Sequence, residues 1–575
     1  MQMKLAHFLF KFFLITILIV LSTALVSAQL FPPTSYPQHY FQWPLKAKIG
    51  LVANFGELRP NHYHMGLDMR TDQKVNLPVY AAADGYIAKV KVEPFGFGQC
   101  IYINHPNGFT TLYAHLNKFY PELEKYIAEQ QYKLQQWQLF LDIPPGLFPV
   151  KKGDFIALSG STGGSQGPHV HFEIRDTKTD KVLNPLLFGM PIPDNVPPVV
   201  LRLAVYNRDQ STYEQTPKLY ALKKVNGVYK PVGGAINVNF DKVSFAISAY
   251  DCFTGSKNPN GIFSAELFDN GKSICGFEMN NISYDETRYL NAHIDYKTRS
   301  NGGPFLQHLS RLSGYNDGIY RSTDGSDGIV SIQPNSTHEI KVVVSDVDQN
   351  SSTIEFSLQN MNVQHAIPAN DPGKMFFPNM FNVFENSNLS FYLPETGVYD
   401  YFNFKYKEIP SATGKTIYQL HNTSVPVQNY FTVRIHDNIA VEDTGHVVMK
   451  RFSGSKTDYK KAVYENGWYK SRFREFGNFQ LQIDHTPPTI TPVGFRDGMH
   501  ATKLTRIAFV VADNSEEIVS FTATLDGNWL RFSNDKGKVF IYLFDEHCGP
   551  GQHELKVVVE DLAGNKVEKV YRFTR

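Results

Sequence analysis

The chain has 575 residues, which is more than one hydrophobic core usually organises, so its length predicts three to five domains. Its 56 Lys and Arg nearly balance its 55 Asp and Glu, and a net charge of +1 excludes a strong overall field that would draw the protein to nucleic acid or to an anionic membrane. The 43 Phe and 31 Tyr, with frequent Gly and Pro, favour short strands.

Residues 1–28 are typical of a secretory signal peptide. Lys4 and Lys11 precede a short apolar run at 12–20, and Val26-Ser-Ala28 offers small residues before a cut at Gln29. The alternative is an uncleaved anchor helix, for which the run is short. No Cys follows the run, so a lipid anchor is not expected. The sequence predicts export to the periplasm or the extracellular side of the envelope, with no stable membrane anchor after cleavage.

The four cysteines are too few and too scattered to form a disulfide framework or a Cys-x-x-Cys zinc motif. They are Cys100, Cys252, Cys275 and Cys548. Only Cys252 and Cys275 are close enough in sequence to suggest a bridge, and the sequence leaves this pairing open.

The first domain after the signal, residues 29–193, alternates strand-like runs with Gly and Asn turns. Runs at 79–92, 99–104 and 109–116 predict a mostly antiparallel sheet. One interruption is helical, because 121–140 has apolar residues at near-helical spacing. This helix is expected either to form a lid or wall beside a site, or to pack on the sheet.

Two later stretches repeat each other. His338 to Asn350 aligns without a gap on His553 to Asn565, and Asp194-Asn-Val-Pro-Pro198 matches Asp484-His-Thr-Pro-Pro488. Each module therefore begins with an Asp-x-x-Pro-Pro linker and ends with a Val-rich strand, a polar turn and a last strand. These ends resemble those of immunoglobulin-like β-sandwich domains of secreted bacterial proteins.

We call the first repeat, residues 194–360, the first β module, and the second, residues 484–575, the last β module. The first carries an insertion rich in Asn, Gly and Ser. Residues 361–483 are aromatic-rich and predict a further β domain. The expected fold class is mostly β and multi-domain. It combines an antiparallel-β first domain carrying a helical insert with β-sandwich modules, through which protein partners would bind.

The stretch from Gly160 to Arg175 carries the clearest chemical signal. It begins as a Gly/Ser loop and continues into a strand, along which alternate side chains point to opposite faces. Val170, Phe172 and Ile174 would therefore face a core, while His169, His171, Glu173 and Arg175 share the other face. Two imidazoles on one face suit a metal site or acid/base chemistry.

Partners for this pair occur earlier in the same domain, in His62-Tyr-His64-Met-Gly-Leu-Asp68 and in Tyr113-Ala-His115-Leu116. Zinc takes nitrogen and carboxylate ligands in a tetrahedral arrangement, and a catalytic site keeps one position for water. Two histidines and one carboxylate satisfy that requirement. Further histidines could take a proton from the water or stabilise a developing oxyanion.

At these residues the sequence resembles the LytM/lysostaphin-like zinc metallopeptidases, which hydrolyse peptide bonds in bacterial peptidoglycan. The resemblance covers residues 41–188. Its motifs are His64-Met-Gly-Leu-Asp68 after Phe55-Gly-Glu-Leu-Arg59, then Ala83-Asp-Gly85, Tyr113-Ala-His115-Leu116, Lys152-Gly-Asp154, and Gly160-Ser-Thr-Gly163 continuing to Pro168-His-Val-His-Phe172. The segment 117–150 is longer than this part of the family's core usually is.

The resemblance implies that His64, Asp68 and His171 bind Zn²⁺. It further implies that His115 and His169 are the catalytic pair that positions and deprotonates water and stabilises the tetrahedral intermediate. The substrate would be a peptidoglycan peptide, cut in a cross-link or a stem. The implied protein is an exported zinc endopeptidase of the murein endopeptidase type.

Other readings of these residues are structural. A lone histidine is usually a surface or packing residue, and His62 and His105, which match no motif position, are assigned to that class. The Gly/Ser loop is either a flexible connector or, as we favour, a groove wall where glycine lets a peptide approach closely. Gly163-Gly-Ser165-Gln-Gly167 matches the Gly-x-Ser-x-Gly pattern of serine hydrolases, but a strand rather than a helix follows, which disfavours Ser165 as a nucleophile.

Two alternative functions stay open. A non-catalytic relative would bind the cell wall or activate another hydrolase, and such proteins typically lack one or more metal ligands, whereas none is missing here. A secreted protease acting on Gly-rich proteins would keep the chemistry and change the substrate. The sequence does not decide between periplasm and medium, and it does not tell whether the 117–150 insert or a downstream module blocks the groove.

Overall fold

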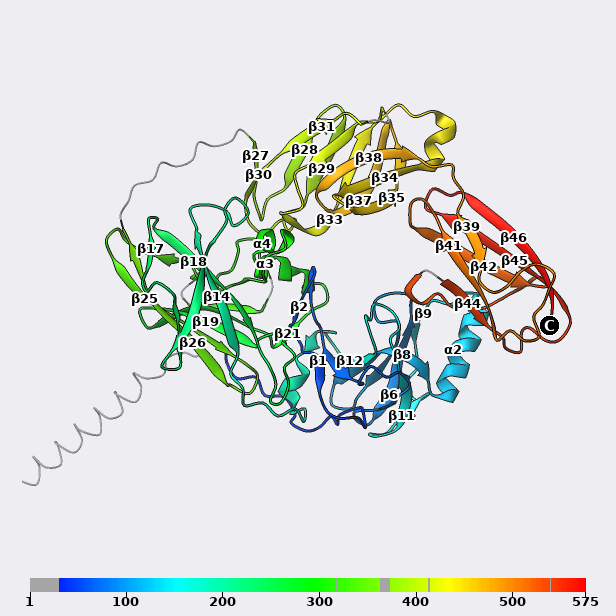
Figure 1. Ribbon diagram of the computed structural model, residues 1–575, viewed down its shortest axis with the longest axis horizontal. Helices are drawn as coiled ribbons and strands as arrows, with labels where there is room; N and C mark the ends of the chain where they lie inside the picture. Colours follow the sequence, from blue (N-terminus) through cyan, green and yellow to red (C-terminus); the bar gives the residue numbers. More distant parts are fainter. Residues whose placement is uncertain (1–29, 317, 324, 362–372, 412–413, 538) are drawn as a thin grey trace, which may run out of the picture.

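The computed structural model describes residues 30–575 except 317, 324, 362–372, 412–413 and 538. The predicted signal peptide, residues 1–28, lies outside the described residues. The structure is 48% strand and 7% helix and has several separate sheets, which confirms the prediction of a mostly β, multi-domain protein. The regions follow one another along an arc, and the end of the chain returns to the first domain (Figure 1).

The first domain is built on one strongly bent antiparallel sheet. In spatial order its main strands are β1 (Leu51–Ala53), β4 (Leu67–Arg70), β12 (His169–Asp176), β8 (Phe109–Phe119), β7 (Gln99–Asn104), β6 (Gly85–Val92) and β10 (Pro149–Val150). Branching from this path are β5 (Pro78–Tyr80), β9 (Leu139–Asp142), β11 (Phe155–Ser159) and β13 (Val182–Leu183), and a separate hairpin joins β2 (Leu58–Arg59) to β3 (His62–Tyr63). A short 3₁₀ helix, η1 (Pro185–Phe188), follows β13.

Strand β12 has the alternation that its sequence predicts. Val170, Phe172 and Ile174 are fully buried in the core of the first domain. Burying each such side chain contributes about 1.5–3 kcal/mol, which fixes which face of the strand turns inward. The opposite face carries the two histidines, and on it His171, Glu173 and Arg175 are buried as well, while His169 is partly buried.

The predicted helix is shorter than expected. It runs as α2 from Pro121 to Leu134 and ends at Gln135, whose backbone is left-handed (φ 52°). Leu139 belongs instead to β9, which pairs with β6. The apolar spacing of 121–140 therefore spans a helix and an edge strand. Leu123 and Ile127 pack into the core of the first domain, so α2 is a packing helix.

The first β module contains the second large sheet. Its path is β22 (Gln307–His308), β18 (Lys242–Tyr250), β14 (Val199–Asn207), β15 (Lys218–Val225), β16 (Val228–Pro231), β26 (Ser351–Asn360), β25 (Thr337–Ser345), β19 (Ser264–Asp269), β20 (Lys272–Glu278) and β23 (Tyr320–Ser322), with β17 (Ile236–Val238) and β24 (Val330–Ser331) attached. Its other elements are β21 (Asn281–Ile282), η2 (Thr287–Tyr289), α3 (Leu290–His293) and α4 (Tyr296–Ser300).

The first domain and the first β module share a hydrophobic core. Phe55, Tyr63 and Met65 come from the loop that carries His64, and they are buried among residues of the module. In addition, β13 pairs with β21 across the boundary. The His64 loop is thus held between two domains.

Residues 373–484 form two five-stranded sheets around one core. One has the order β28 (Asn382–Glu385), β29 (Leu389–Leu393), β33 (Pro426–His436), β37 (Trp468–Glu475), β36 (Val463–Glu465), and the other β31 (Tyr406–Ile409), β32 (Ile417–Leu420), β38 (Gly477–Ile483), β34 (Val447–Ser453), β35 (Lys456–Lys461). A hairpin-like pair, β27 (Lys374–Phe376) with β30 (Phe402–Phe404), and η3 (Val441–His446) complete the region.

The last β module also packs two sheets on one core. They are β39 (Thr489–Pro492), β41 (Arg506–Ala512), β44 (Val539–Leu543), and β40 (Met499–His500), β46 (Lys566–Thr574), β45 (Gln552–Asp561), β42 (Ile518–Leu525), β43 (Asn528–Trp529), with η4 (Asp535–Gly537) before β44. The two repeats found in the sequence form strands β25 and β45. Each is followed by a turn and by an antiparallel last strand, β26 or β46. Their immunoglobulin-like classification stays a prediction.

All four cysteines are free thiols, so the pairing of Cys252 with Cys275 that the sequence left open is not formed. Within the described residues, no helix has both the length and the apolar character needed to cross a bilayer.

Candidate metal centre

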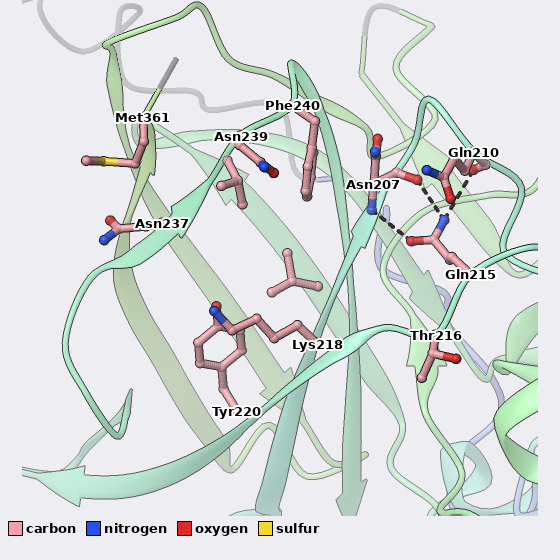
Figure 2. A pocket seen from close by; sticks show the side chains of 12 residues that line it. Asn207, Gln210, Gln215, Thr216, Lys218, Tyr220, Asn237, Asn239, Phe240 and Met361 are labelled. Atoms are coloured by element: carbon pink, nitrogen blue, oxygen red, sulfur yellow. Dashed lines mark hydrogen bonds between the residues drawn. The ribbon is translucent and has the colours of Figure 1, made fainter. Parts of the chain in front are cut away.

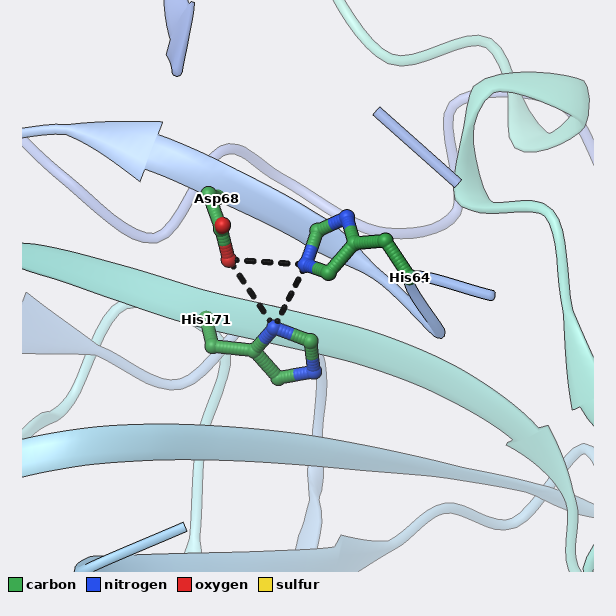
Figure 3. Close-up of side chains that lie close together, drawn as sticks. All are labelled: His64, Asp68 and His171. Atoms are coloured by element: carbon green, nitrogen blue, oxygen red, sulfur yellow. Dashed lines mark hydrogen bonds and ion pairs between the residues drawn. The ribbon is translucent and has the colours of Figure 1, made fainter. Parts of the chain in front are cut away.

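Three side chains of the first domain converge on one point (Figure 3). Asp68 Oδ1 lies 2.9 Å from His64 Nε2 and 2.9 Å from His171 Nδ1, and the two nitrogens are 3.1 Å apart. Asp68 on β4 and His171 on β12 are directly paired in the sheet register, and His64 lies in the short link between β3 and β4. The structure therefore brings together the three residues for which the sequence predicts metal binding.

Gly66 explains the spacing of the His-x-Gly-x-Asp box. A Cβ atom at this position would lie 2.4 Å from the carbonyl oxygen of Phe172 and 3.0 Å from the His171 ring. Only glycine lets the link between β3 and β4 approach β12 this closely. The approach is what places His64 opposite His171.

Hydrogen bonds fix which nitrogen of each ring faces the cluster. His64 Nδ1–H donates to the carbonyl of Asn54 at 2.7 Å, and His171 Nε2–H donates to Glu173 Oε1 at 2.9 Å. The inner nitrogens of the neutral rings are therefore both acceptors, and they face a carboxylate that is also an acceptor. Three converging acceptors need a positive charge between them.

The donor set fits zinc. Two imidazole nitrogens and one carboxylate oxygen form a ligand set of catalytic zinc sites. Ligands about 2.0–2.1 Å from a tetrahedral zinc lie about 3.3 Å from one another, close to the 2.9–3.1 Å found here. The outward hydrogen bonds to Asn54 and Glu173 are of the kind that orients metal-binding histidines.

The electrostatics of the cluster also favour a cation. Burial would raise the pKa of Asp68, yet the charge that His64 can carry and the close approach of the three imidazoles hold that pKa well below its usual range. Burial would lower the pKa of His171, but its bonds to Asp68 and Glu173 raise that pKa to about 9. Both shifts show that the protein surroundings stabilise positive charge at this point.

Behind His171 is a buried charged network that the sequence did not predict as functional. Burial would raise the pKa of Glu173, but Arg175 and His171 lower it to about 2. Arg175 Nε donates to Glu173 Oε2 at 2.7 Å, and the hydroxyl of Tyr284, from the first β module, donates to Glu173 Oε1. The spacing of Glu173 two residues after His171 is a signal that could have been found. Tyr284 is 111 residues away and gives no such signal.

His115 and His169 lie beside the three converging residues. Their ring centroids are 4.7 Å apart, His169 Nε2 is 3.3 Å from Asp68 Oδ1, and the His115 ring is 6.0 Å from that of His171. His115 Nδ1–H donates to the Thr162 carbonyl at 2.9 Å and His169 Nδ1–H to the Gly167 carbonyl at 2.8 Å. All five residues singled out in the sequence thus form one cluster.

The backbone at His115 is unusual for a strand. Its φ is 58°, in the left-handed region, where β7 and β8 shift register. Bulges of this kind re-aim side chains, and strained non-glycine residues tend to occur at functional sites. Burial, together with His169 and His171, lowers the pKa of His115 to about 3, so the imidazole is neutral at neutral pH.

The Gly/Ser loop carries the carbonyl groups that orient both of these histidines. Thr162 Oγ1 donates to the Leu116 carbonyl at 2.8 Å, which ties the loop to the strand of His115. Ser165 Oγ donates to the Gly167 carbonyl at 2.6 Å. It also lies 3.3 Å from His169 Nδ1, but that nitrogen carries the proton donated to Gly167, so it cannot accept the proton of the Ser165 hydroxyl. Ser165 is therefore placed as a loop residue and not as a nucleophile.

The last β module holds this loop from outside. Asp535 Oδ1 accepts from the Gly163 backbone N–H at 2.8 Å, and Lys536 Nζ donates to the Ser165 carbonyl at 2.7 Å. The same module contacts α2, where Tyr132 stacks on His547 with centroids 3.7 Å apart. We call the Asp535 and Lys536 contacts the loop clamp.

Access to the cluster is restricted in this arrangement. His64, Asp68, His115 and His171 are each at most 9% exposed. His62 and His105 are outside the cluster, as expected: His62 bonds the Pro60 carbonyl, and buried His105 bonds the Asp84 carbonyl and Thr111.

A cavity of about 520 Å³ lies elsewhere, in the first β module (Figure 2). It is lined mainly by amide side chains such as Asn207, Gln210 and Gln215, with Tyr220 and Phe240, and none of the five clustered residues contributes to it. Gln215 is already hydrogen-bonded to Asn207 and Gln210 there. Among the described residues that line it there is no Asp, Glu, His, Cys or Ser.

Comparison with known protein families places the first domain. Residues 62–132 match the family model described as Peptidase family M23, and residues 373–484 match that of a Zu5-like domain. The resemblance predicted from the motifs is thereby confirmed: the first domain is an M23 peptidase domain of the LytM-like type.

Curated relatives agree with this assignment over the same part of the chain. An uncharacterized metalloprotease of Haemophilus influenzae is 35% identical over 136 residues, or 24% of this chain and 22% of the relative. The DD-carboxypeptidase/endopeptidase Mpg of Neisseria meningitidis is 34% identical over 131 residues, 23% of this chain and 24% of the relative. The peptidoglycan DD-endopeptidase ShyB of Vibrio cholerae is 32% identical over 111 residues, 19% of this chain and 20% of the relative. The match therefore spans about a quarter or less of each of these proteins.

Proposed function

We propose that this chain is an exported zinc endopeptidase that hydrolyses peptide bonds in the cross-links or stems of bacterial peptidoglycan. One observation carries the proposal: His64 Nε2, Asp68 Oδ1 and His171 Nδ1 lie within 3.1 Å of one another, with each ring oriented by a hydrogen bond on its far side. The names of the relatives, a metalloprotease and two endopeptidases, support the reaction class. The word peptidoglycan in the name of the Vibrio relative supports the substrate.

The proposed roles follow from the hydrogen bonds. His64, Asp68 and His171 would hold the zinc, which when bound lowers the pKa of a coordinated water and polarises a carbonyl oxygen. His115 is neutral and donates through Nδ1, so its Nε2 is free to orient a water molecule and accept its proton. His169, likewise anchored through Nδ1, presents Nε2 to the same space, and with a proton on that nitrogen as well it would donate to the substrate oxygen and stabilise its negative charge.

The test combines metal analysis with product analysis on the purified mature chain. We expect about one zinc per molecule, muropeptide fragments released from purified peptidoglycan, loss of release with a chelator and recovery with added zinc. His171→Ala should lose both zinc and turnover, whereas His169→Ala should keep zinc and lose turnover.

The same preparation separates the alternatives. A scaffold would carry no stoichiometric zinc and release nothing. A protease of Gly-rich proteins would digest such a protein and leave peptidoglycan intact in a parallel assay. Full peptidoglycan hydrolysis by either histidine variant would contradict the assignment of these residues.

A further inference from the structure

Each of the two β modules contains a cluster of three aspartates near its beginning. In the first β module these are Asp194, Asp251 and Asp346, and in the last β module Asp484, Asp513 and Asp561. In each cluster, one carboxylate oxygen from every member lies within 4.8 Å of the others. None of the six belongs to the centre described above.

The two clusters are built in the same way. Asp194 and Asp484 begin the Asp-x-x-Pro-Pro linkers, and the residue after each linker pairs with the residue before the second aspartate: Val199 with Tyr250, and Thr489 with Ala512. The third aspartate lies at the end of the Val-rich strand of the repeat: Asp346 directly follows β25, and Asp561 is the last residue of β45.

The hydrogen bonds repeat as well. Asn350 donates its backbone N–H to Asp346 Oδ1 at 2.9 Å and its amide to Oδ2 at 2.8 Å, while Asn565 makes the same two bonds to Asp561 at 2.8 Å each. Asp194 Oδ1 accepts from the Val196 N–H, and Asp484 Oδ1 from the Thr486 N–H. The two clusters therefore hold their carboxylate oxygens in the same arrangement, although the sequences around them differ.

In both clusters the same oxygens are buried without a partner. Asp194 Oδ2 and Asp251 Oδ1 in one module, and Asp484 Oδ2 and Asp513 Oδ1 in the other, have no hydrogen-bond donor among the described residues. Asp251 is only 2% exposed and Asp484 only 6%. A buried charged oxygen without a partner costs several kcal/mol, so its repetition at matching positions requires a ligand that supplies positive charge.

The nearest basic side chain, where one is near at all, is engaged elsewhere: Lys461 interacts with Asp561 only at longer range and donates to the Ala563 carbonyl. None of the six aspartates forms an ion pair with Lys, Arg or His within the part of the chain that the structure describes. The missing partner is therefore a cation from solution.

We propose that each cluster binds one calcium ion. All the ligands offered are oxygens, which suits a hard cation and not zinc, and calcium accepts carboxylates in flexible arrangements of six to eight oxygens. The ion would join the linker aspartate to the turn that ends the repeat. At the last β module, Asn565 also donates to the Asp484 carbonyl at 3.0 Å, so the ion would reinforce the joint with the preceding region.

The test is a calorimetric titration of the full mature chain, loaded with zinc at its catalytic centre, with calcium chloride. We expect two calcium ions per chain, with dissociation constants of about 0.1–1 mM, as in extracellular modules. Asp251→Asn and Asp513→Asn should each lose one ion, and the double variant both. Asp209→Asn, a change at an exposed aspartate of the first β module, should keep both.

Thermal unfolding gives a second readout. Calcium at 5 mM should raise the unfolding midpoint of wild type by about 5 °C or more over a calcium chelator, and magnesium should not. In the chelator, the Asn variants should unfold at or above the wild-type midpoint, since each removes a buried negative charge. This shows that they fold. Absence of calcium binding by wild type, an equal response to magnesium, or two ions retained by the double variant would overturn the proposal.

Discussion

Glu173 accepts a hydrogen bond from His171 on the side of the imidazole that faces away from Asp68. The two residues are neighbours on one face of β12, and Glu173 is completely buried. This contact fixes the tautomer of His171 and turns its Nδ1 toward the metal centre. In the proposed zinc site, the Glu173 carboxylate would therefore set the basicity and the orientation of His171.

Replacing Glu173 should weaken zinc binding without removing a ligand. In Glu173→Leu the His171 ring loses its orienting acceptor, and we expect zinc affinity to fall about 10- to 100-fold. Glu173→Gln retains an acceptor oxygen but not the charge, and should lose less. Competition with a chromophoric chelator measures both. Unchanged affinity in the Leu variant would show that β12 alone orients the ring.

Tyr284 extends this network into a second domain. Tyr284→Phe removes the hydroxyl that donates to Glu173 and keeps the aromatic ring beside Phe97 and Arg175. Loss of one hydrogen bond to a charged group is worth about 1.5–3 kcal/mol at most, so we expect zinc affinity to fall about 3- to 10-fold. Tyr220→Phe in the same module is the matched control and should have no effect. Equal effects from both changes would contradict a specific role for Tyr284.

Breaking the loop clamp should increase turnover. The double change Asp535→Ala and Lys536→Ala removes both hydrogen bonds to the Gly/Ser loop, next to residues that are now at most 9% exposed. Two such bonds are worth about 1–3 kcal/mol, so we expect kcat/KM on soluble peptidoglycan fragments to rise about 5-fold, and by no more than about 150-fold. Lys503→Ala, a change at an exposed lysine of the same module, serves as the control. A fall in activity at unchanged zinc content would show instead that the clamp positions the loop.

The first β module should lose stability in acid through a buried histidine. Burial, aided by the charge of Arg208, lowers the pKa of His308 to about 3, whereas the unfolded chain protonates near 6.5. The contribution of the neutral ring to the free energy of unfolding is fully present above pH 6.5 and is lost as pH falls toward 3. Between pH 7 and pH 5 the free energy of unfolding should fall by ~2 kcal/mol.

His308→Phe should remove this share of the pH dependence, because phenylalanine does not titrate. The measurement is urea unfolding of wild type and variant at pH 7, 6 and 5. As pH falls, the unfolding free energy of wild type should decrease more than that of the variant. A constant difference would mean that the ring is not held neutral in the native state.

Much of the candidate site could be predicted because its residues occur at short, characteristic spacings in the sequence. His64, Asp68 and His171 occur in compact motifs, and the alternation of β12 assigns its two faces. The predicted end of the helix was wrong. Leu139 fits a helical period and a strand equally well, and only its pairing with β6 shows that it belongs to a strand. Residues 1–28 and the domain boundaries stay predictions.

The parts that could not be predicted depend on residues far apart in the chain. Tyr284 meets Glu173, and Asp535 meets Gly163, only because separate domains pack together. The Asp-x-x-Pro-Pro repeat was visible in the sequence. The contribution of Asp251 and Asp513 to the clusters was not visible, because each simply follows an ordinary strand and only the sheet register brings it to the linker.

The contact between Asp535 and Gly163 joins positions 372 residues apart. A ribosome makes the peptidase domain long before it reaches the segment that holds the loop, and domains generally fold as they emerge. A chain that has been made as far as residue 483 would therefore hold the clustered histidines, Asp68 and the first β module that supports them, without the two contacts of the loop clamp. A single proteolytic cut ahead of the last β module would remove the same two contacts from the finished protein, so the far end of the chain can change the surroundings of a loop that was made hundreds of residues earlier.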